Sequence, residues 1–299
     1  MPTSPDPTAG PVHGFIGLGH QGSPMAERMI AAGLRPWLWA RRAEVLDRYR
    51  GTDARLASSP AEIGARCDVI GLCLYDADAI DTVLFGDEGL VAAARPGTVL
   101  AVHATVPPTY VTDLAARVAD RGLRVVDAPV SGGDEAAAAG KLLVITGGEP
   151  DDVAVCEPMF STYSDHVVPV GPAGAAQAAK LVNNSLMAAI TGLVFDAFEL
   201  GAALHIDEPG LGRILGGGSA ANPSVHHYLA LGGAETFSVR AWPTLHKDVA
   251  LARRASDSVG RAPGPLLAGA EATIEDMARR RAPWEEARRR GREAAAGSD

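Results

Sequence analysis

The feature that most constrains the fold of this chain is an alternation of short apolar runs and helix-like segments between about residues 12 and 170. Short runs rich in valine, isoleucine and leucine are typical of buried strands, and helical patterns between them are typical of parallel βαβ units. Since a parallel sheet needs helices on both faces, we predict an α/β domain with a mainly parallel sheet. The apolar runs are HGFIG, WLWA, DVIGLCL, TVLAV, LRVVDA, LLVIT and HVVPV.

The second half of the chain has a different pattern, because strand signals end after Gly171. One helical pattern runs from about residue 173 to residue 204, and a helix of that length spans about 45 Å, enough to connect two domains. Shorter helical patterns follow and predict an all-α C-terminal domain. We divide the chain into a flexible tail (1–11), the α/β domain (12–171), a long interdomain helix (172–204) and a helical domain (205–299).

Composition limits the partners of this chain. Its 27 basic and 36 acidic residues give a formal net charge of -9, which repels phosphate backbones and anionic lipids, so we predict no nucleic-acid and no membrane partner. The most apolar stretch, residues 181–195, is shorter than the about 20 residues of a membrane-spanning helix. We expect a second copy to cover the apolar faces of the helical domain, as a homodimer. Three cysteines without paired spacing predict a reducing, cytoplasmic location. Because no compact set of His, Cys and Asp residues stands in the sequence, we predict no metal site.

The segment GLGHQG follows the first predicted strand and precedes a predicted helix, with Gly17, Gly19 and Gly22 in a G-x-G-x-x-G pattern. In such a turn the first glycine permits the tight bend, the second lets the backbone approach a pyrophosphate, and the third allows close helix packing. The alternative is a glycine turn without a ligand. The strand-turn-helix context favours a Rossmann-like, dinucleotide-binding domain over residues 12–171.

The end of the second predicted strand indicates which dinucleotide binds. NAD-binding folds usually place an acidic residue there for the ribose hydroxyls, whereas this chain has Ala40 followed by Arg41 and Arg42. Paired guanidinium groups suit a 2'-phosphate in charge and geometry. Two solvated loop arginines are the alternative, and we predict NADP as the preferred cofactor over NAD.

Lys180 is the one cation in the long helical pattern, where its neighbours are small or apolar. We expect it to point into a cleft, where desolvation lowers the pKa of its amine toward neutrality. Asn184 lies four residues further and therefore on the same helix face. The two side chains could hold one substrate oxygen, although a solvated helix lysine is the alternative.

Two other stretches carry polar groups of possible function. DAPVSGG offers Ser131, Gly132 and Gly133, whose hydroxyl and backbone N–H groups could cradle a carboxylate. LHKDVALA places Lys247 and Asp248 in a helical pattern that is otherwise apolar. An ordinary glycine turn and a solvated ion pair are the alternatives.

Taken together, GLGHQGSPMA, DAPVSGG, GPAGAAQAAKLVNN and KDVALA resemble, in order and spacing, the motifs of the β-hydroxyacid dehydrogenase family. This family includes 3-hydroxyisobutyrate dehydrogenases, tartronate semialdehyde reductases and glyoxylate/succinic semialdehyde reductases. The resemblance extends from residue 12 to about residue 252. It implies an oxidoreductase that transfers a hydride between NADP(H) and a small β-hydroxy acid, or the matching semialdehyde, with a carboxylate on the substrate.

The resemblance also implies roles for individual residues. Lys180 matches the catalytic lysine that exchanges the proton of the alcohol oxygen, Asn184 matches the asparagine that positions the substrate, and Thr105 matches an element beside the nicotinamide. The implied cofactor-binding residues are Gly17, Leu18, Gly19, His20, Gln21, Gly22, Ala40, Arg41, Arg42, Thr105 and Lys247. The implied substrate-binding residues are Ser131, Gly132, Gly133 and Asp248, to which we add Arg240.

Some positions depart from the family pattern and leave the activity open. Gln21 stands where the family often has Met, which we expect to alter packing under the pyrophosphate. Arg240 stands where several relatives carry an aromatic residue, and we hypothesise that it reads a second anionic group of the substrate, unless it is a solvated loop arginine. An imine reductase of the same architecture and a non-catalytic NADP-binding regulator are the alternative functions. Lys180 argues against the first, and the intact set of Lys180, Asn184 and Asp248 argues against the second.

Overall fold

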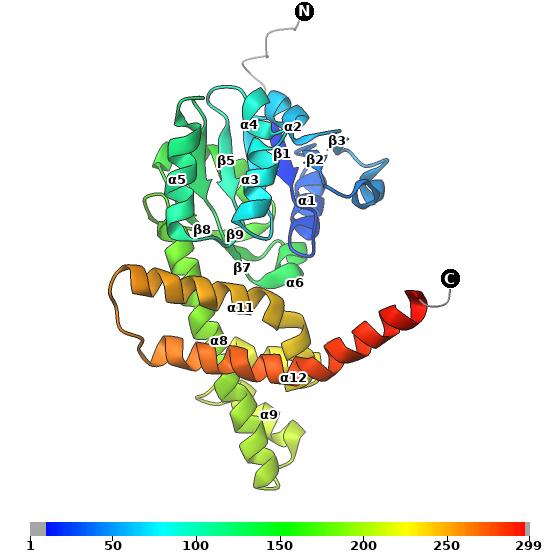
Figure 1. Cartoon of the computed structure of the whole chain (residues 1–299), viewed down its shortest axis with the longest axis vertical. Helices are drawn as coiled ribbons and strands as arrows, with labels where there is room; N and C mark the ends of the chain where they lie inside the picture. The colour runs from blue at the N-terminus through cyan, green and yellow to red at the C-terminus, as the bar shows by residue number, and fades with distance from the viewer. Residues whose placement is uncertain (1–9, 297–299) are drawn as a thin grey trace, which may run out of the picture. The chain divides into compact units, whose positions relative to one another are not determined.

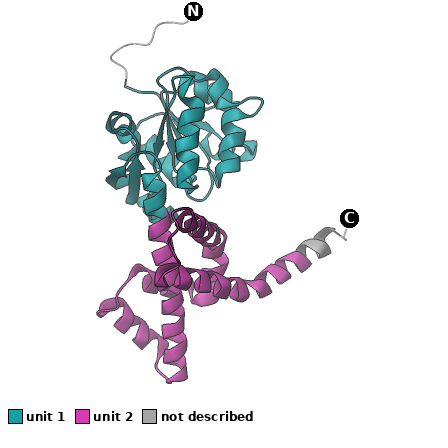
Figure 2. Cartoon of the chain, turned by 60° about the vertical axis from the view of Figure 1, so that its left-hand side comes forward, with its two compact units in different colours: residues 1–180 teal, residues 181–299 magenta. Residues whose placement is uncertain are grey.

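The computed structural model describes residues 10–296, with side chains up to residue 290. The chain forms two compact units, residues 1–180 and residues 181–299 (Figure 2). The limit between them falls inside one helix, and the domain limits given above stay predictions. Residues 1–9 of the predicted tail lie outside the described residues.

Within the described part of unit 1, nine strands form one sheet in the order β3-β2-β1-β4-β5-β6-β8-β7, with β9 beside β8 (Figure 1). The strands from β3 to β6 are all parallel, whereas β8 is antiparallel to β6 and β7 and parallel to β9. The predicted mainly parallel sheet is therefore confirmed. The strands are β1 (His13–Ile16), β2 (Trp37–Trp39), β3 (Arg55–Leu56), β4 (Val69–Leu72), β5 (Val99–Val102), β6 (Arg124–Asp127), β7 (Val130–Ser131), β8 (Leu142–Gly147) and β9 (Ser164–Gly171).

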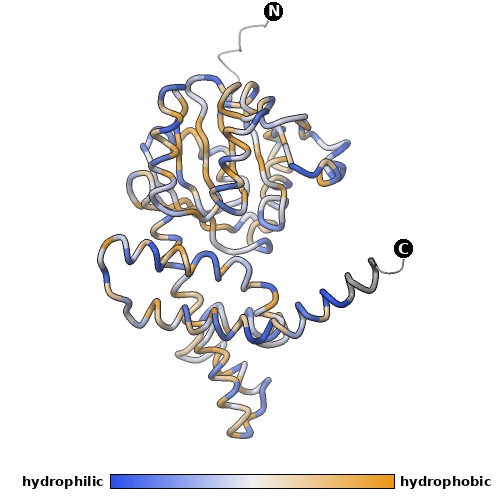
Figure 3. Tube along the Cα trace, in the orientation of Figure 1, coloured by the Kyte–Doolittle hydropathy of each residue, from blue (hydrophilic) through white to orange (hydrophobic). Residues whose placement is uncertain are grey.

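Helices cover both faces of this sheet because successive residues of each central strand point to opposite sides. In β5, Val99 and Ala101 pack in a core with residues of α1, α6 and α7, whereas Leu100 and Val102 pack in a second core with residues of α2 to α5. The central strands are apolar almost throughout, as Figure 3 shows. The helices of unit 1 are α1 (Gly22–Ala31), the 3-10 helix η1 (Ala43–Tyr49), α2 (Pro60–Arg66), α3 (Ala77–Phe85), α4 (Leu90–Ala93), α5 (Pro108–Ala119), α6 (Gly133–Ala139) and α7 (Pro150–Phe160).

The long predicted helix is present as α8 (Ala175–Ala203), which begins in unit 1 and continues into unit 2. Unit 2 is helical, as predicted, and its remaining helices begin or end at residues suited to those positions. The side chains of Asp207 and Asn222 cap α9 and α10, and Gly232, with a φ of +77°, ends α10. These helices are α9 (Glu208–Gly217), α10 (Pro223–Leu231), α11 (Ala234–Ser258) and α12 (Pro265–Ala296).

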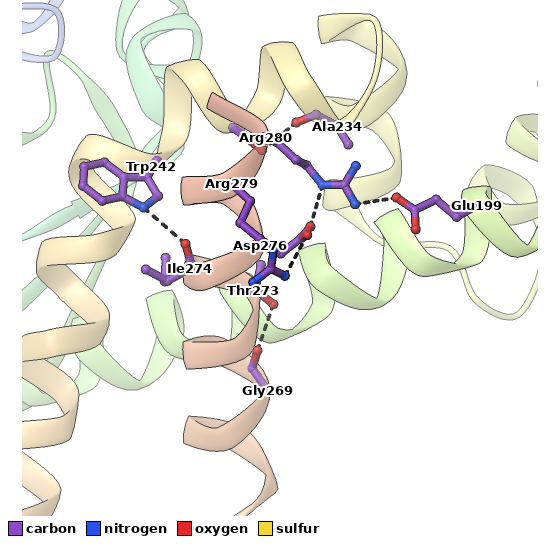
Figure 4. Close-up of polar contacts among 10 residues, drawn as sticks. Glu199, Ala234, Trp242, Gly269, Thr273, Ile274, Asp276, Arg279 and Arg280 are labelled. Carbon is purple, nitrogen blue, oxygen red and sulfur yellow. Dashed lines mark hydrogen bonds and ion pairs between the residues drawn. The ribbon is translucent and has the colours of Figure 1, made fainter. Parts of the chain in front are cut away.

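Polar contacts join the helices of unit 2 around its apolar core (Figure 4). Arg280 of α12 pairs with Asp276 of its own helix at 2.5 Å and with Glu199 of α8. The indole N–H of Trp242 on α11 donates to the carbonyl of Ile274 on α12 at 3.2 Å. These contacts fix α8, α11 and α12 to one another within unit 2.

One face of α8 in unit 2 carries exposed apolar side chains, which we call the α8 stripe: Val182, Leu186, Leu193 and Leu200. Their spacings of four and seven residues place them along one side of the helix.

By length and composition alone α8 could also cross a membrane, although Asn183, Asn184 and Asp196 interrupt it. The expectation that no segment is long and apolar enough was therefore wrong, because it considered residues 181–195 and not the whole helix.

The three cysteines are free; Cys67 and Cys156 are fully buried, and Cys73 is half-buried. Burial raises the pKa of each of the Cys67, Cys73 and Cys156 thiols to about 12. All three are therefore protonated at neutral pH.

Candidate active site

The three glycines of the predicted dinucleotide loop meet three different requirements. Gly17 has a φ of +102°, and a Cβ there would lie 2.1 Å from the Cys73 carbonyl oxygen. At Gly22 a Cβ would lie 1.9 Å from the Gly17 carbonyl oxygen, whereas nothing lies within 4 Å of the corresponding position at Gly19. The loop is thus closed beneath Gly17 and Gly22 and open at Gly19. Together with the N-terminus of α1, this cradle fits a dinucleotide pyrophosphate.

The side chains of this loop divide between packing and polar roles. Leu18 is buried, and its carbonyl accepts from the Ser23 hydroxyl at 2.9 Å, while His20 is exposed. Gln21 does more than alter packing, because its side-chain amide donates to the Gly133 carbonyl at 3.5 Å. The predicted cofactor loop and the predicted substrate loop are therefore neighbours within unit 1.

The residues predicted to select NADP follow the strand next to the glycine-rich loop. β2 is parallel to β1, with Trp39 opposite Ile16, so Ala40 and Gly17 leave the sheet at the same edge. Arg41 and Arg42 come next and are both exposed, and the Arg42 guanidinium lies 4.0 Å from the Glu44 carboxylate.

The predicted carboxylate cradle begins where β7 ends. Ser131 is partly exposed, and Gly132 and Gly133 are exposed with φ values of +130° and +76°. These φ values suit glycine, since side chains are rarely tolerated there. Thr105, beyond the end of β5, is also partly exposed.

His103, two residues before Thr105, is a buried core residue with two polar partners. Its Nδ1 lies 2.7 Å from the Ala128 carbonyl oxygen, and its Nε2 lies 3.1 Å from the Tyr163 hydroxyl. Burial lowers the pKa of His103 to about 4. It is therefore neutral at physiological pH.

Lys180 and Asn184 lie four residues apart on α8, and both are nearly buried, with 8% and 4% of their surfaces exposed. Lys180 is therefore shielded from solvent, whereas the cleft and the lowered pKa expected for it stay predictions. Asn184 belongs to a polar network of unit 2, in which its amide nitrogen donates to Asp248 Oδ2 at 2.6 Å. The Lys247 ammonium lies 2.9 Å from Asp248 Oδ1.

Asp248 has no exposed surface, and its two oxygens contact two other predicted site residues, Asn184 and Lys247. Unit 2 thus brings three of the predicted residues together. Arg240, on the same helix α11, is exposed. Unit 1 carries the glycine-rich loop, Thr105, the Ser131 loop and Lys180.

Sequence reasoning missed two buried residues near Lys180, namely Asp127 and Gln177. Asp127 Oδ2 accepts from the backbone N–H groups of Gly174 at 3.1 Å and Gln177 at 3.0 Å. The Gln177 side chain bonds to the backbone beside Thr105. A signal existed for Gln177, since it is the one polar side chain among the alanines that precede Lys180. Within the described residues, no group of His, Cys, Asp and Glu could hold a metal ion.

Two family models match most of the chain. Residues 13–171 match the NAD binding domain of 6-phosphogluconate dehydrogenase, and residues 174–287 match the NAD-binding model of NADP-dependent 3-hydroxyisobutyrate dehydrogenase. L-threonate dehydrogenase of Cupriavidus necator is 35% identical over 199 residues, which are 66% of this chain and 67% of that protein.

Solved structures share the fold. Mycobacterium tuberculosis 3-hydroxyisobutyrate dehydrogenase with L-serine has a TM-score of 0.78 at 24% identity, over 90% of this chain and 94% of that chain. The Streptomyces aurantiacus imine reductase has a TM-score of 0.62 at 20% identity, over 90% and 93%. The family models and the curated relatives together define a nicotinamide-dependent oxidoreductase that acts on the hydroxyl group of hydroxy acids. The chain belongs to the β-hydroxyacid dehydrogenase family, the 3-hydroxyisobutyrate dehydrogenase type.

Proposed function

We propose that this enzyme interconverts a small β-hydroxy acid and its semialdehyde, with NADP(H) preferred and Lys180 as the proton-transfer residue. The observation that carries this proposal is the near-complete burial of Lys180, with 8% exposed, in the unit that also holds the glycine-rich loop. A buried lysine amine is shielded from bulk water, and an amine at such a position suits direct proton exchange with a bound alcohol oxygen.

Each predicted site residue then has a task. Lys180 takes the proton from the alcohol oxygen during oxidation and returns it during reduction. The N–H groups of Gly132 and Gly133, with the Ser131 hydroxyl, hold the substrate carboxylate, since exposed N–H groups in such a turn suit an anion. Bound NADP(H) supplies the hydride chemistry. Asn184, whose amide is oriented by Asp248, sets the position of the reacting carbon, and such placement supplies much of the rate.

The experiment that tests this function follows nicotinamide absorbance with NADPH and NADH against semialdehydes, glyoxylate and cyclic imines. We expect NADPH oxidation by a carboxylated aldehyde, and a rate roughly 10³-fold lower in Lys180→Ala, as expected for loss of a general acid-base residue. Lys141→Ala is the matched control, because Lys141 is an exposed lysine of the same unit. Its rate should equal that of the wild type.

Two results would change the assignment. Turnover of imines that survives in Lys180→Ala would favour an imine reductase of this fold. Tight NADPH binding without turnover of any carbonyl compound would favour a non-catalytic regulator.

The preference for NADP rests on Arg41 and Arg42 beside the glycine-rich loop. Both are exposed and follow the strand end at which the adenosine ribose of a dinucleotide binds in such folds. In Arg41→Ala/Arg42→Ala, we expect the KM for NADPH to rise about tenfold, as expected for the loss of one or two charge-assisted hydrogen bonds. The KM for NADH should stay unchanged, and an equal rise for both cofactors would contradict the preference.

Arg240 supports a narrower proposal, that a second anionic group of the substrate binds to its guanidinium. Its exposure on α11 leaves it accessible to a ligand. Unchanged turnover of mono- and dicarboxylated substrates in Arg240→Ala would overturn this role.

The α8 stripe supports a homodimer in which a second copy covers it. Leu193 alone is 69% exposed, and a contiguous apolar face of this kind typically marks an interface. We expect light scattering to give twice the chain mass for the wild type and one chain mass for Leu193→Glu, with Val259→Glu, an exposed apolar residue at the end of α11, as control. A monomeric wild type would overturn the dimer.

The free cysteines fit the cytoplasmic location that we also propose.

A further inference from the structure

Gln177 lies in the first turns of α8, three residues before Lys180, and has no exposed surface. The Val106 N–H donates to its Oε1 at 3.0 Å, and its Nε2 donates to the Ala104 carbonyl at 3.1 Å. Both polar atoms of the amide are therefore used on one short backbone segment. Thr105 lies between the two bonded residues, so the segment is the one predicted to lie beside the nicotinamide.

Asp127 provides a second tie to the same turn of α8. As the last residue of β6, it accepts hydrogen bonds from the Gly174 and Gln177 N–H groups, which belong to the helix start and have no carbonyl partner inside the helix. A Cβ at Gly147 would lie 2.4 Å from Asp127 Oδ1, so the arrangement also requires glycine there. The start of α8 is thereby fixed to the ends of both β5 and β6.

We propose that Gln177 is a positioning residue for Lys180, because its amide fixes the rotation of the first turns of α8 against residues 104–106. The two residues are less than one helical turn apart, so a displacement of Gln177 moves Lys180 with it. This inference rests on the proposed role of Lys180. Gln177 itself is buried against backbone and contacts neither substrate nor cofactor in this role.

Three variants separate positioning from general stability. Gln177→Met removes both hydrogen bonds and keeps the length of the side chain. Gln177→Glu keeps the acceptor, lacks the donor while ionised, and regains a donor when the carboxyl is protonated. Thr191→Val is the matched control, since it removes a buried hydrogen bond on the same helix, from Thr191 to the Ser224 hydroxyl at 3.0 Å, far along α8 from Lys180.

The chain has only three lysines, Lys141, Lys180 and Lys247, so side-chain NMR of ¹³C,¹⁵N-lysine reports on Lys180 directly. We expect the Lys180 signal, assigned by its absence in Lys180→Ala, to shift in Gln177→Met and to stay unchanged in Thr191→Val. In Gln177→Glu it should return toward the wild-type position as the pH falls and the introduced carboxyl group is protonated. Lys141 serves as the internal reference.

Kinetics give the second readout. We expect kcat to fall roughly 100-fold in Gln177→Met, which is the effect of misplacing a reacting group by about 1 Å, with KM values near those of the wild type. Gln177→Glu should recover activity relative to Gln177→Met at low pH. Thr191→Val should keep the wild-type kcat.

The outcomes distinguish this inference from the proposed function. An unchanged Lys180 signal in Gln177→Met, or an equal shift in Thr191→Val, overturns the positioning role whether or not a substrate is found. A shifted signal with an unchanged kcat overturns it as well. A shifted signal in a protein that turns over no carbonyl compound keeps the positioning role and overturns the proposed function. If Gln177→Met does not fold, the Lys180 signal and kcat of Gln177→Glu are compared at high and low pH instead, where the introduced carboxyl group is ionised and protonated.

Discussion

Asp127 in unit 1 and Asp248 in unit 2 are both completely buried, but they have partners of different kinds. Asp127 accepts hydrogen bonds from two backbone N–H groups, whereas Asp248 contacts an amide side chain and an ammonium group. The strand ends and helix start of unit 1 offer unused backbone donors, while the backbone groups inside the helices of unit 2 bond to one another. A buried carboxylate among helices therefore depends on other side chains.

The two solutions differ in their electrostatic cost. Neutral backbone donors offset only part of the free-energy cost of burying a charged carboxylate. Burial therefore raises the pKa of Asp127, even though hydrogen bonds from the N–H groups of Gln177 and Gly174 lower it. The Lys247 ammonium compensates Asp248 with a full opposite charge at 2.9 Å. The difference predicts that loss of the charge destabilises the protein much more at Asp248 than at Asp127.

The largest effect is expected for Asp248→Asn. Removing one partner of a buried ion pair leaves the other charge uncompensated, which typically costs about 3–5 kcal/mol of unfolding free energy. Urea unfolding at pH 7 measures this loss.

A double-mutant cycle with Lys247→Met identifies the cause. Because the partner of Asp248 is a side chain, Lys247→Met/Asp248→Asn should recover most of the stability that the single changes lose. Additive losses would contradict the ion pair as the cause.

The next largest effect is a pH dependence of the unfolding free energy that His103 causes. Its Nδ1 bonds to a backbone carbonyl. Its pKa of about 4 lies below the ordinary value of 6.5, so the unfolded chain takes up the proton first as the pH falls. The low pKa of His103 therefore contributes to the unfolding free energy fully above pH 6.5. This contribution, about 3 kcal/mol in total, is lost as the pH falls from 6.5 to 4.

Replacement of the titrating group tests this pH dependence. His103→Gln should flatten the pH dependence of urea unfolding between pH 7 and 4.5. Tyr163→Phe, which removes the hydroxyl partner but keeps the imidazole, should leave it steep. Equal slopes in wild type and His103→Gln would exclude His103 as the source.

The smallest effect is expected for Asp127→Asn. Asparagine keeps the acceptor for Gly174 and Gln177 and removes the buried charge, so the loss of unfolding free energy at pH 7 should not exceed about 1 kcal/mol. Since burial raises the pKa of Asp127, the wild type loses stability relative to Asp127→Asn as the pH rises through that pKa. Unfolding of both proteins from pH 4 to pH 8 checks the sign, and a constant difference would contradict it.

Much of the fold could be predicted because its signals are local. All seven predicted apolar runs contain strands of the sheet, and the long helix has nearly the predicted bounds. The strands β3 and β7 were missed because two residues are too few to show an alternating pattern. The antiparallel pairing of β7 with β8 was also missed, because the two strands are joined through the short helix α6 and Gly140, and no pattern in that segment reports the direction of the pairing.

The candidate site was predictable where a motif carries it and not where a contact joins distant residues. Lys180, Asn184 and the glycines stand in recognisable stretches. The partners of Asp127, Gln177 and His103 lie far away in sequence, for example 71 residues between Gln177 and Val106. No pattern along the chain reports such pairings, because they depend on which strand ends become neighbours.

The protonated thiols have a practical consequence for work on the intact enzyme. Maleimide reagents react with thiolates, and pKa values of about 12 leave Cys67, Cys73 and Cys156 with almost none at pH 7. A single cysteine introduced in the α8 stripe, such as Leu193→Cys, would therefore take up a spin label selectively. Distances between two labels could then be measured in solution without first removing any native cysteine.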